Sequence, residues 1–481
     1  MTEKPIIVWF RNDLRLTDNR ALAAAAAAGA PLIALFILDD GAAGAWRMGG
    51  ASRWWLDKSL AALAADIESH GGRLVLRRGN AAAILAELAD HCGAAAIYCS
   101  RAYEPWARRQ EDAVRDALEA AGVAMKRFGG ALLREPEELR TKAGEPFKVY
   151  TPFWRALVAL GEPKLPSAAP AWLAFARSPP RSDRLDEWAL HPAKPDWSRR
   201  MAAAWTPGEA GALARLDRFL ASALTDYAEH RNRPDIEGTS RLSPHLHSGE
   251  ISPALCWHRA RAVAASDPSA EKGLETFLKE LVWREFSYHL LAHWPDLPEA
   301  PFRPEFAAFP WVDDDRALRA WQRGQTGYPI VDAGMRELWA TGYMHNRVRM
   351  IAASFLVKDL LVPWQQGETW FWDTLVDADL ASNAASWQWV AGSGADAAPY
   401  FRIFNPVTQG QKFDPEGTYV RRWVPELTRI QGAAIHEPWA QPALVLRDAG
   451  VKLGETYPER LVLHSEARGR ALAAFAKLKA V

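Results

Sequence analysis

The sequence predicts an α/β plus all-α protein: a doubly wound parallel sheet at the amino terminus, a long connector, and a helical domain at the carboxyl terminus. Short apolar runs alternate with helical stretches up to residue 133, prolines crowd residues 134–207, and helical patterns dominate residues 208–481. Strands that alternate with helices are typical of a parallel sheet covered on both faces. We therefore expect domains at 1–133 and 208–481, joined by a connector at 134–207.

The first domain contains apolar runs of strand length at regular intervals. The stretches between them are rich in alanine and have helical periodicity. The predicted strands are Ile6–Phe10, Leu32–Leu38, Arg73–Leu76, Ala95–Cys99 and Ala124–Phe128, and the predicted helices are Ala21–Ala28, Trp54–Ser69, Ala81–His91 and Arg108–Ala121. Such a sheet usually binds a ligand at the carboxyl ends of its strands. The segment Phe10–Leu16 is not a Gly-rich phosphate-binding turn, so a dinucleotide fold or a P-loop is not expected.

The connector and the second domain differ in their proline content. Closely spaced prolines between Pro136 and Pro207 leave room for one short helix, near Phe153–Leu160. After Gly208, helical patterns recur at Leu213–Glu229, Pro253–Ala265, Leu274–His293, Ala333–Trp339, Asn346–Leu361 and Glu368–Val376. We find no internal repeat.

Charge and cysteine content limit the classes of function. The chain has 58 Lys+Arg against 58 Asp+Glu. This balance argues against indiscriminate binding of nucleic acid, although it permits a local basic groove. Cys92, Cys99 and Cys256 leave one thiol unpaired in any disulfide scheme and lack the spacing of a zinc site. We therefore expect a reducing cytoplasm and no metal.

Two further features of composition need an interpretation. The uncharged stretch Ala21–Leu38 is nearly long enough to span a membrane, but Gly29–Pro31 divides it, so we predict a helix, a turn and a buried strand. The 23 tryptophans are an anomaly, because indoles are bulky and a globular core does not require so many.

The segment Glu237–Pro244 (EGTSRLSP) places three hydroxyls and a cation at the start of a predicted helix. Hydroxyls and backbone N–H groups at such a position suit a phosphate. The alternative is ordinary helix capping by Thr239 or Ser243, which composition alone favours.

Two other clusters combine charge with hydrogen-bonding capacity. Glu280, Trp283 and Arg284 share one helical face and could hold a flat polar ring, although spacing alone favours a salt-bridged surface turn. His345–Met350 (HNRVRM) offers two arginines, and Asp377–Asn383 (DADLASN) offers carboxylates for a buried pairing. No Ser/His/Asp arrangement, HExxH motif or metal-ligand cluster is present, so hydrolytic chemistry is not predicted.

Taken in order, these motifs resemble the photolyase/cryptochrome flavoprotein family over essentially the whole chain. The motifs are Phe10–Thr17 (FRNDLRLT), Glu237–Pro244, Glu280–Phe286 (ELVWREF), Thr326–Asp332 (TGYPIVD), His345–Met350, Asp377–Asn383, Trp387–Trp389 (WQW) and Ala398–Pro406 (APYFRIFNP). The resemblance implies an α/β antenna domain, a connector and a helical domain that holds FAD in a folded conformation.

The resemblance also assigns cofactor-binding residues. It implies that Arg349 pairs with Asp377 beside the isoalloxazine, that Asp379 lies near the polar edge of the ring, and that Asn383 faces flavin N5. The resemblance implies that the FAD phosphates and ribityl chain are bound by Tyr227, Thr239, Ser240, Arg241, Leu242 and Ser243. This role favours an anion site over simple helix capping in this segment. Ala378 is a further implied cofactor-binding position.

The implied reaction is light-driven splitting of cyclobutane pyrimidine dimers in DNA by an electron from excited reduced FAD. The dimer leaves the duplex, and its weakened stacking lowers the cost of flipping. Glu280 would hydrogen-bond the dimer, and Trp283 and Trp389 would give it stacking walls. Positions that match DNA contacts are Arg231, Arg284, Asn346, Arg347 and Gln409.

Three tryptophans match the family's relay for electrons between the surface and the flavin. They are Trp387, Trp364 and Trp311, with Tyr343 as a possible branch. The other tryptophans keep an ordinary interpretation as core or surface residues.

The branch of the family is predicted from three positions. Asn383 fits a repair enzyme, because plant cryptochromes typically carry Asp there, and Asn346 and Met350 stand where six-four photolyases typically place histidines. Glu280, Met350 and Asn383 together favour repair of cyclobutane dimers. The alternatives are a six-four photolyase and a cryptochrome-type photoreceptor without repair activity.

The remaining predictions concern the antenna chromophore and the oligomeric state. Folate-binding relatives carry an Asn-Glu pair where this chain has Trp106 and Ala107. We favour methenyltetrahydrofolate held in another way, with Trp106 stacking on the pterin, over a deazaflavin or no antenna. The expected protein is a cytoplasmic monomer that binds DNA containing pyrimidine dimers and no membrane.

Overall fold

The computed structural model describes residues 4–397 and 401–478, which form two compact units. The first unit comprises Met1–Thr225, Ser240–Pro295 and Val376–Asp379, and the second comprises Asp226–Thr239, Asp296–Leu375 and Leu380–Val481. Packing thus groups the first helices after residue 208 with the sheet. Buried hydrogen bonds support this grouping, since Arg15 donates to the carbonyl of Gly249 at 2.8 Å. The predicted limits at 133/134 and 207/208 stay predictions.

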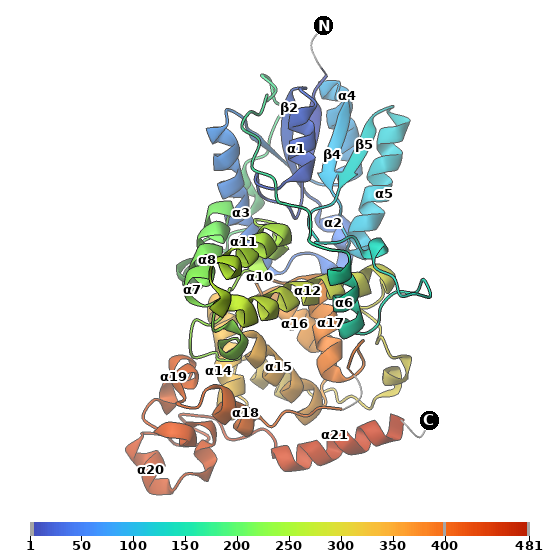
Figure 1. Cartoon of the computed structure of the whole chain (residues 1–481). Coiled ribbons are helices and arrows are strands. Elements are labelled where there is room, and N and C mark those ends of the chain that lie inside the picture. Colours follow the sequence, from blue (N-terminus) through green and yellow to red (C-terminus); the bar gives the residue numbers. More distant parts are fainter. Residues whose placement is uncertain (1–3, 398–400, 479–481) are drawn as a thin grey trace. The chain divides into compact units, whose positions relative to one another are not determined.

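The first unit is built on a five-stranded parallel sheet of order β3-β2-β1-β4-β5 (Figure 1). The strands are β1 Ile6–Phe10, β2 Leu32–Leu38, β3 Leu74–Arg78, β4 Ala96–Ser100 and β5 Ala124–Phe128. In the register, Ile6 lies opposite Leu32 on one side and Ala96 on the other. The predicted parallel sheet is confirmed, with strand limits that differ from the predictions by two residues at most.

Successive residues of a strand point to opposite faces of the sheet, and in the buried strands the residues on both faces are apolar. Helices therefore cover both faces. α1 (Arg20–Ala27) and α3 (Gly50–Ser69) pack on the face of Val8 and Phe10. α4 (Ala81–Cys92) packs on the face of Ile7 and Trp9, together with α5 (Pro105–Ala120). The predicted division of Ala21–Leu38 into helix, turn and strand is confirmed by α1 and β2. In the described part of the chain, no helix combines the length and the apolar character needed to cross a membrane.

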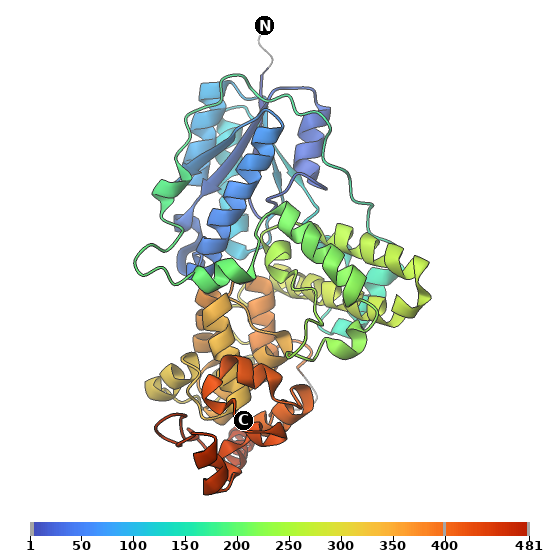
Figure 2. The same cartoon turned by 90° about the vertical axis from the view of Figure 1, so that its left-hand side faces the viewer.

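The connector, drawn in teal to green in Figure 2, bonds to the edge strand β3 through Ser182 and Asp183. Leu76 N–H donates to Ser182 Oγ at 2.9 Å, and Asp183 N–H donates to the carbonyl of Leu76 at 2.8 Å. The sheet edge is thereby paired and not left open. The connector contains the predicted helix, α6 (Tyr150–Ala159), and a second short helix, α7 (Arg199–Ala204), that was not predicted.

The helical part of the first unit consists of α8 (Glu209–Ser222), α10 (Ser243–His247), α11 (Pro253–Ser266) and α12 (Glu271–His293). The single helix predicted over Leu213–Glu229 is wrong, because α8 ends and α9 (Tyr227–His230) begins after a break. Leu224 lies within this break, and its carbonyl packs so closely on Gly273 of α12 that a Cβ there would lie 1.7 Å from it.

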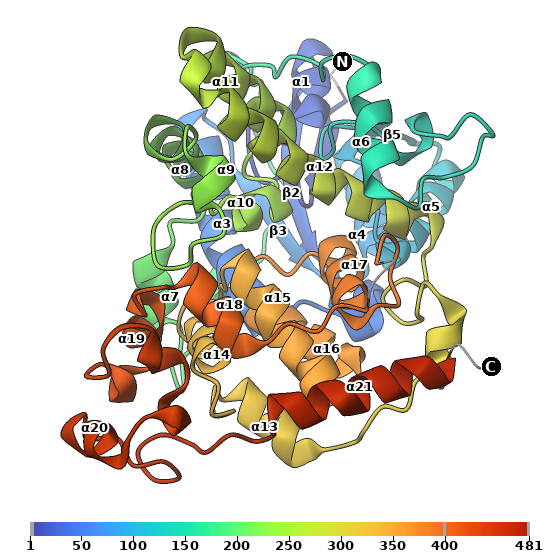
Figure 3. The same ribbon diagram turned by 60° about the horizontal axis from the view of Figure 1, so that its bottom comes forward.

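The second unit is helical in its described part (Figure 3). After α9, its helices are α13 Asp315–Gln322, α14 Pro329–Thr341, α15 Asn346–Ser354, α16 Trp364–Thr374, α17 Leu380–Ala391, α18 Pro406–Phe413, α19 Thr418–Trp423, α20 Ala443–Asp448 and α21 His464–Leu478. The helix predicted over Asn346–Leu361 changes character halfway. A π-helical turn, Phe355–Asp359, follows α15. The helix ends before Leu361, whose φ is +57°.

Candidate functional site

The segment before α10 has an irregular backbone that is fixed by its side chains. Arg241 has a φ of +51°, and its guanidinium lies 4.8 Å from the ring centre of Trp205. Ser243 is exposed, and its hydroxyl donates to Asp377 Oδ2 at 2.6 Å. Helix capping by Thr239 or Ser243 is wrong, because Leu242 is the N-cap of α10 and no side chain caps it. The hydroxyl of Ser243 therefore belongs to a polar cluster with Asp377.

Asp379 is the centre of a second polar cluster in the first unit. The hydroxyl of Tyr288 donates to Asp379 Oδ2, and His247 Nδ1 lies 3.5 Å from the same oxygen. Burial alone would raise the pKa of Asp379, but His247, the cation of Arg284 and the Tyr288 hydroxyl outweigh it and hold that pKa below its usual range. A fixed carboxylate can accept hydrogen bonds from the edge of a polar ring.

Sequence reasoning missed the carboxylate that anchors α10, Glu250. This side chain is fully buried and accepts from Trp55 Nε1 (3.0 Å) and the backbone N–H of Gly208 (2.7 Å). It also contacts the hydroxyl of Ser59 and His245 Nδ1. One acid thus joins α10 to α3 and to the start of α8. No local pattern distinguishes it from a surface glutamate, because its partners come from distant parts of the sequence.

α12 carries the predicted lesion-binding residues Glu280, Trp283 and Arg284. Glu280 is half-buried, and Trp283 stacks on Tyr150 with ring centres 3.6 Å apart and planes inclined by 5°. The stack holds the indole of Trp283, which remains 36% exposed, in one orientation. Arg284 donates to the carbonyl of Ala131 at 2.8 Å, so this arginine also ties α12 to the segment that follows β5.

Asn383 lies on α17 in the second unit, and its amide is oriented by α16. Its Nδ2 donates to the carbonyl of Glu368 at 3.0 Å, which leaves the amide oxygen to face another partner. The Glu368 side chain is 1% exposed, and its Oε1 has no hydrogen-bond partner among the described residues. Burial and the nearby Glu299 raise the pKa of Glu368 well above its usual value. The neutral acid is therefore favoured beside Asn383.

The proposed relay tryptophans all belong to the second unit. Trp387 and Trp364 are buried, and Trp311 is half-buried against Phe309, with ring centres 4.4 Å apart. The ring of Trp387 rests on Gly367, where a Cβ would lie 2.1 Å from it. Gly367 is one helical turn after Trp364 on α16, so Trp387 packs on the face of α16 that carries Trp364.

Another indole, which the sequence did not single out, also contacts Trp387. Trp321 is fully buried, its ring centre lies 6.1 Å from that of Trp387, and its N–H donates to the carbonyl of Ala352 at 2.9 Å. Phe371 contacts both indoles. Sequence spacing could not identify Trp321, because it belongs to a different helix, α13.

Several predicted DNA-contacting residues lie around the start of α15 in the second unit. His345 is the N-cap, Asn346 is exposed, and Arg347 is half-buried. Arg349 Nε donates to the carbonyl of Met344 at 2.7 Å, and its guanidinium lies over the ring of Tyr343. Arg349 and Asp377 belong to different units, so their pairing stays a prediction.

The remaining predicted residues of this unit are partly accessible, with one exception. Arg231, Met350, Trp389 and Gln409 are half-buried, whereas Tyr227 is buried on α9. The guanidinium of Arg402 lies 5.6 Å from the ring centre of Trp389. Residues 398–400 of the APYFRIFNP motif lie outside the described residues. Within the described ranges, no group of three or more His, Cys, Asp or Glu side chains could hold a metal ion.

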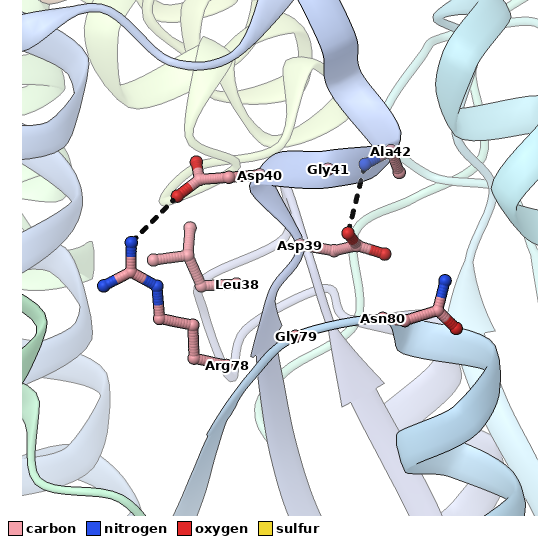
Figure 4. Close-up of a pocket in the computed structure, with 8 residues that line it drawn as sticks. All are labelled: Leu38, Asp39, Asp40, Gly41, Ala42, Arg78, Gly79 and Asn80. Atoms are coloured by element: carbon pink, nitrogen blue, oxygen red, sulfur yellow. Dashed lines mark hydrogen bonds and ion pairs between the residues drawn. The ribbon is translucent and has the colours of Figure 1, made fainter.

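The carboxyl edge of the sheet offers one further cavity, of about 390 Å³ (Figure 4). It lies between the ends of β2 and β3, and Asp39, Asp40, Arg78 and Asn80 are among its lining residues. Arg78 and Asp40 form an ion pair at 3.3 Å. The switch point of the strand order, between β1 and β4, is filled by Arg11, which bonds to the carbonyl of Ser100 and to Glu111. The cavity at this edge therefore lies between β2 and β3, one strand away from the switch point.

Comparisons with known proteins agree with this architecture of a parallel sheet followed by a helical flavin-binding domain. Residues 6–171 match the family model described as DNA photolyase, and residues 277–477 match the FAD binding domain of DNA photolyase. The chain belongs to the DNA photolyase family of flavoproteins. It is 52% identical to the deoxyribodipyrimidine photo-lyase of Agrobacterium fabrum over 475 residues, covering 99% of this chain and 98% of the relative.

A solved structure and a more distant relative define the branch. The bacterial class III photolyase from Agrobacterium tumefaciens superimposes with a TM-score of 0.96 at 52% identity, covering 100% of this chain and 99% of that one. Cryptochrome-1 of Arabidopsis thaliana is 39% identical over 477 residues, covering 96% of this chain and 69% of the relative. The sequence-based interpretation as an FAD-containing photolyase is confirmed, since the cryptochrome is the more distant of these relatives.

Proposed function

We propose that this photolyase uses blue light to split cyclobutane pyrimidine dimers in DNA. The observation that carries the proposal is the match along the full chain to a photolyase. We further propose that Asn383, Met350 and Glu280 act in repair. The amide of Asn383 is already oriented by its bond to the carbonyl of Glu368. An amide cannot give up a proton as an acid would, which favours repair over the photochemistry of plant cryptochromes.

The polar clusters of the first unit fit the cofactor. Ser243 is exposed and bonded to Asp377, and Asp379 is held as a carboxylate by Tyr288 and His247. FAD, when bound, supplies the light-excited electron donor. The residues that we propose to hold it are Tyr227, Thr239, Ser240, Arg241, Leu242, Ser243, Arg349, Asp377, Ala378, Asp379 and Asn383.

Glu280, Trp283 and Trp389 would receive the flipped dimer. The stack on Tyr150 holds Trp283 in place before the lesion arrives, which reduces the entropy lost on binding. Glu280 would donate or accept a hydrogen bond at the polar edge of the dimer. Residues at the rim, Arg231, Arg284, Asn346, Arg347 and Gln409, would contact the DNA backbone, so a local basic groove serves a chain of zero net charge.

A repair assay tests this function. Reduced protein would be illuminated with DNA that carries thymine dimers or six-four lesions, and the intact lesions would be counted. We expect loss of thymine dimers only. Glu280→Gln should lower the repair yield more than it lowers lesion binding, whereas Glu275→Gln, an exposed acid on the same helix, should leave both unchanged. Untouched thymine dimers would refute the proposal and favour the cryptochrome alternative.

We also propose that Trp387, Trp364 and Trp311 carry electrons to the flavin from the surface. Trp364→Phe should slow photoreduction of oxidised FAD severalfold or more, measured by the loss of flavin absorbance under blue light. The matched control is Trp370→Phe, a half-buried tryptophan on the same helix that stacks on Trp339. An unchanged rate in Trp364→Phe would mean that another route dominates, such as one through Tyr343.

The antenna proposal is methenyltetrahydrofolate with Trp106 stacked on the pterin. Trp106 is half-buried in the first turn of α5, and its ring N–H has no partner among the described residues. One turn further on the same face, Gln110 donates to Asp39 at the wall of the carboxyl-edge cavity. An extracted chromophore identified by mass tests this proposal, and a deazaflavin mass would overturn it. We further propose that the protein acts as a cytoplasmic monomer.

A further inference from the structure

Trp205, the C-cap residue of α7 in the connector, is a buried indole with a cation on its ring. Its side chain is 5% exposed, and the guanidinium of Arg241 lies over the ring, 4.8 Å from the ring centre. The indole is itself held in place. Trp55 of α3 packs edge-on against it, with ring centres 5.5 Å apart and planes inclined by 71°, and the N–H of Trp55 donates to Glu250 at 3.0 Å. The side chain of Arg241 therefore lies on a fixed platform within the first unit.

The backbone of Arg241 is strained. Its φ of +51° lies in the left-handed region, where the Cβ atom of an L-residue approaches the carbonyl oxygen that follows it. A residue other than glycine keeps such a conformation where its surroundings fix it. Here the side chain of Arg241 lies on Trp205, and two residues further on the hydroxyl of Ser243 donates to Asp377 at 2.6 Å. The segment Ser240–Ser243 is thus held at two points.

We propose that Trp205 is a positioning residue that, through Arg241, holds the segment Ser240–Ser243 in the conformation that binds the phosphates of FAD. The inference rests on the proposed function, since it takes this segment as part of the cofactor site. The attraction between a cation and the face of an indole offsets the cost of the left-handed backbone. A segment that is already ordered loses less conformational freedom when the dinucleotide binds. The connector would thereby contribute to cofactor binding without a contact of its own.

The indole and the strained backbone give separate predictions. Trp205→Leu removes the aromatic face, so FAD should be released about three- to tenfold faster than from the wild type. Trp205→Phe keeps a weaker aromatic face, and its release rate should lie between the two. Arg241→Met loses the cation and keeps the strain, whereas Arg241→Gly loses the cation but adopts a positive φ without a steric penalty. Arg241→Gly should therefore release FAD more slowly than Arg241→Met, an order that loss of packing around Trp205 would not produce.

The experiment measures the release of FAD from the loaded full chain after dilution in the dark, by the increase in flavin fluorescence. The four single variants are compared with the double variant Trp205→Leu/Arg241→Met. The double variant should release FAD no faster than Arg241→Met, since the two residues act through one contact. Arg215→Gln is the matched control. Arg215 of α8 also lies over the ring of Trp205, 5.2 Å from its centre, but it belongs to no segment assigned to the cofactor, so its loss should leave the release rate unchanged.

The outcomes separate this inference from the proposed function. A wild-type release rate in Trp205→Leu, or single effects that add in the double variant, would overturn the positioning role and leave the proposed function standing. Equal rates in Arg241→Gly and Arg241→Met would also overturn it, and so would an Arg215→Gln variant that releases FAD as fast as Trp205→Leu. If the wild-type chain holds no FAD, the proposed function fails first. Should Trp205→Leu not fold, the comparison of the two Arg241 variants still decides, because Arg241 is only half-buried.

Discussion

Two buried acids, Asp379 in the first unit and Glu368 in the second, differ in the direction in which the protein shifts their pKa values. In the first unit, Glu250 and Asp379 are surrounded by donors from side chains and backbone, and the pKa of Asp379 is lowered. In the second unit, Glu368 is equally buried, but an oxygen of its carboxyl lacks a partner among the described residues, and its pKa is raised. In Asp379 the interactions with His247, Arg284 and Tyr288 outweigh the effect of burial on the pKa, whereas in Glu368 the effect of burial dominates.

The charged carboxylate and the neutral acid lie in regions with different proposed roles. The carboxylate of Asp379 belongs to a cluster that we propose to bind the polar parts of the cofactor. The second unit contains the tryptophan relay, and a neutral Glu368 adds no charge on the helix that also carries Trp364. Substitutions that remove a charge but keep the shape of the side chain can test the contrast.

The largest effect is expected at Glu250. Glu250→Leu keeps much of the bulk of the side chain but removes the oxygen that accepts from Trp55, Ser59 and the backbone N–H of Gly208. We expect the free energy of unfolding to fall by about 3–5 kcal/mol, as when one partner of a buried charged network is removed. Urea denaturation followed by circular dichroism measures this change. A loss below about 1 kcal/mol would show that the donors do not need the carboxylate.

The next effect concerns Asp414, an intermediate case in the second unit. Burial raises its pKa to about 6, although it accepts from the backbone N–H groups of Tyr419 and Val420. Because the folded chain holds this proton more tightly than the unfolded chain, the contribution of Asp414 to stability should be complete below pH 4 and should decline as the pH rises through 6. The decline should amount to about 3 kcal/mol. Asp414→Asn should show a flatter profile over the same range.

A smaller effect is expected at Asp379, whose pKa is lowered. Asp379→Asn removes the charge that faces His247 and Tyr288, and it should cost about 2–3 kcal/mol at pH 7. The contribution of a carboxylate with a lowered pKa is present above pH 4 and is lost as the pH falls. The difference between wild type and variant should therefore shrink in acid, which thermal unfolding at several pH values can follow. A constant difference would mean that packing and not charge is responsible.

The smallest effect is expected at Glu368. Since the neutral acid is favoured, Glu368→Gln should change the free energy of unfolding by less than about 1.5 kcal/mol near pH 5, as shape-conserving swaps do. An acid with a raised pKa loses stability as the pH rises, so the variant should become the more stable protein in alkali. A strongly destabilised variant at pH 5 would imply that Glu368 is ionised, and the contrast between the two regions would fail.

The fold was predictable where short-range patterns decide it. The strands of the sheet are apolar runs on a regular spacing, and neighbouring helices cannot alter that pattern. The helix predicted over Leu213–Glu229 failed at the break between α8 and α9, where Leu224 packs against Gly273, some fifty residues away in the sequence. The π turn Phe355–Asp359 likewise follows a sequence with no break in its helical periodicity.

The site was predictable only as far as the family resemblance named its residues. Spacing alone favoured capping for Ser243 and a surface salt bridge for Arg284, whereas the structure joins Ser243 to Asp377 and Arg284 to the carbonyl of Ala131. Glu250 and Trp321 were missed altogether. Each gains its importance from partners on distant segments, so no motif of neighbouring residues could mark them.

Gly367 is a residue whose importance lies in what it lacks. A hydrogen stands where any other residue would place a carbon atom against the ring of Trp387. Electron tunnelling weakens exponentially with separation, so the bare backbone at this position acts as a spacer of minimal thickness between the helix that bears Trp364 and the neighbouring indole. Gly367→Ala would thicken that spacer by one methyl group. The speed of the proposed relay thus depends on a position that carries no redox group of its own.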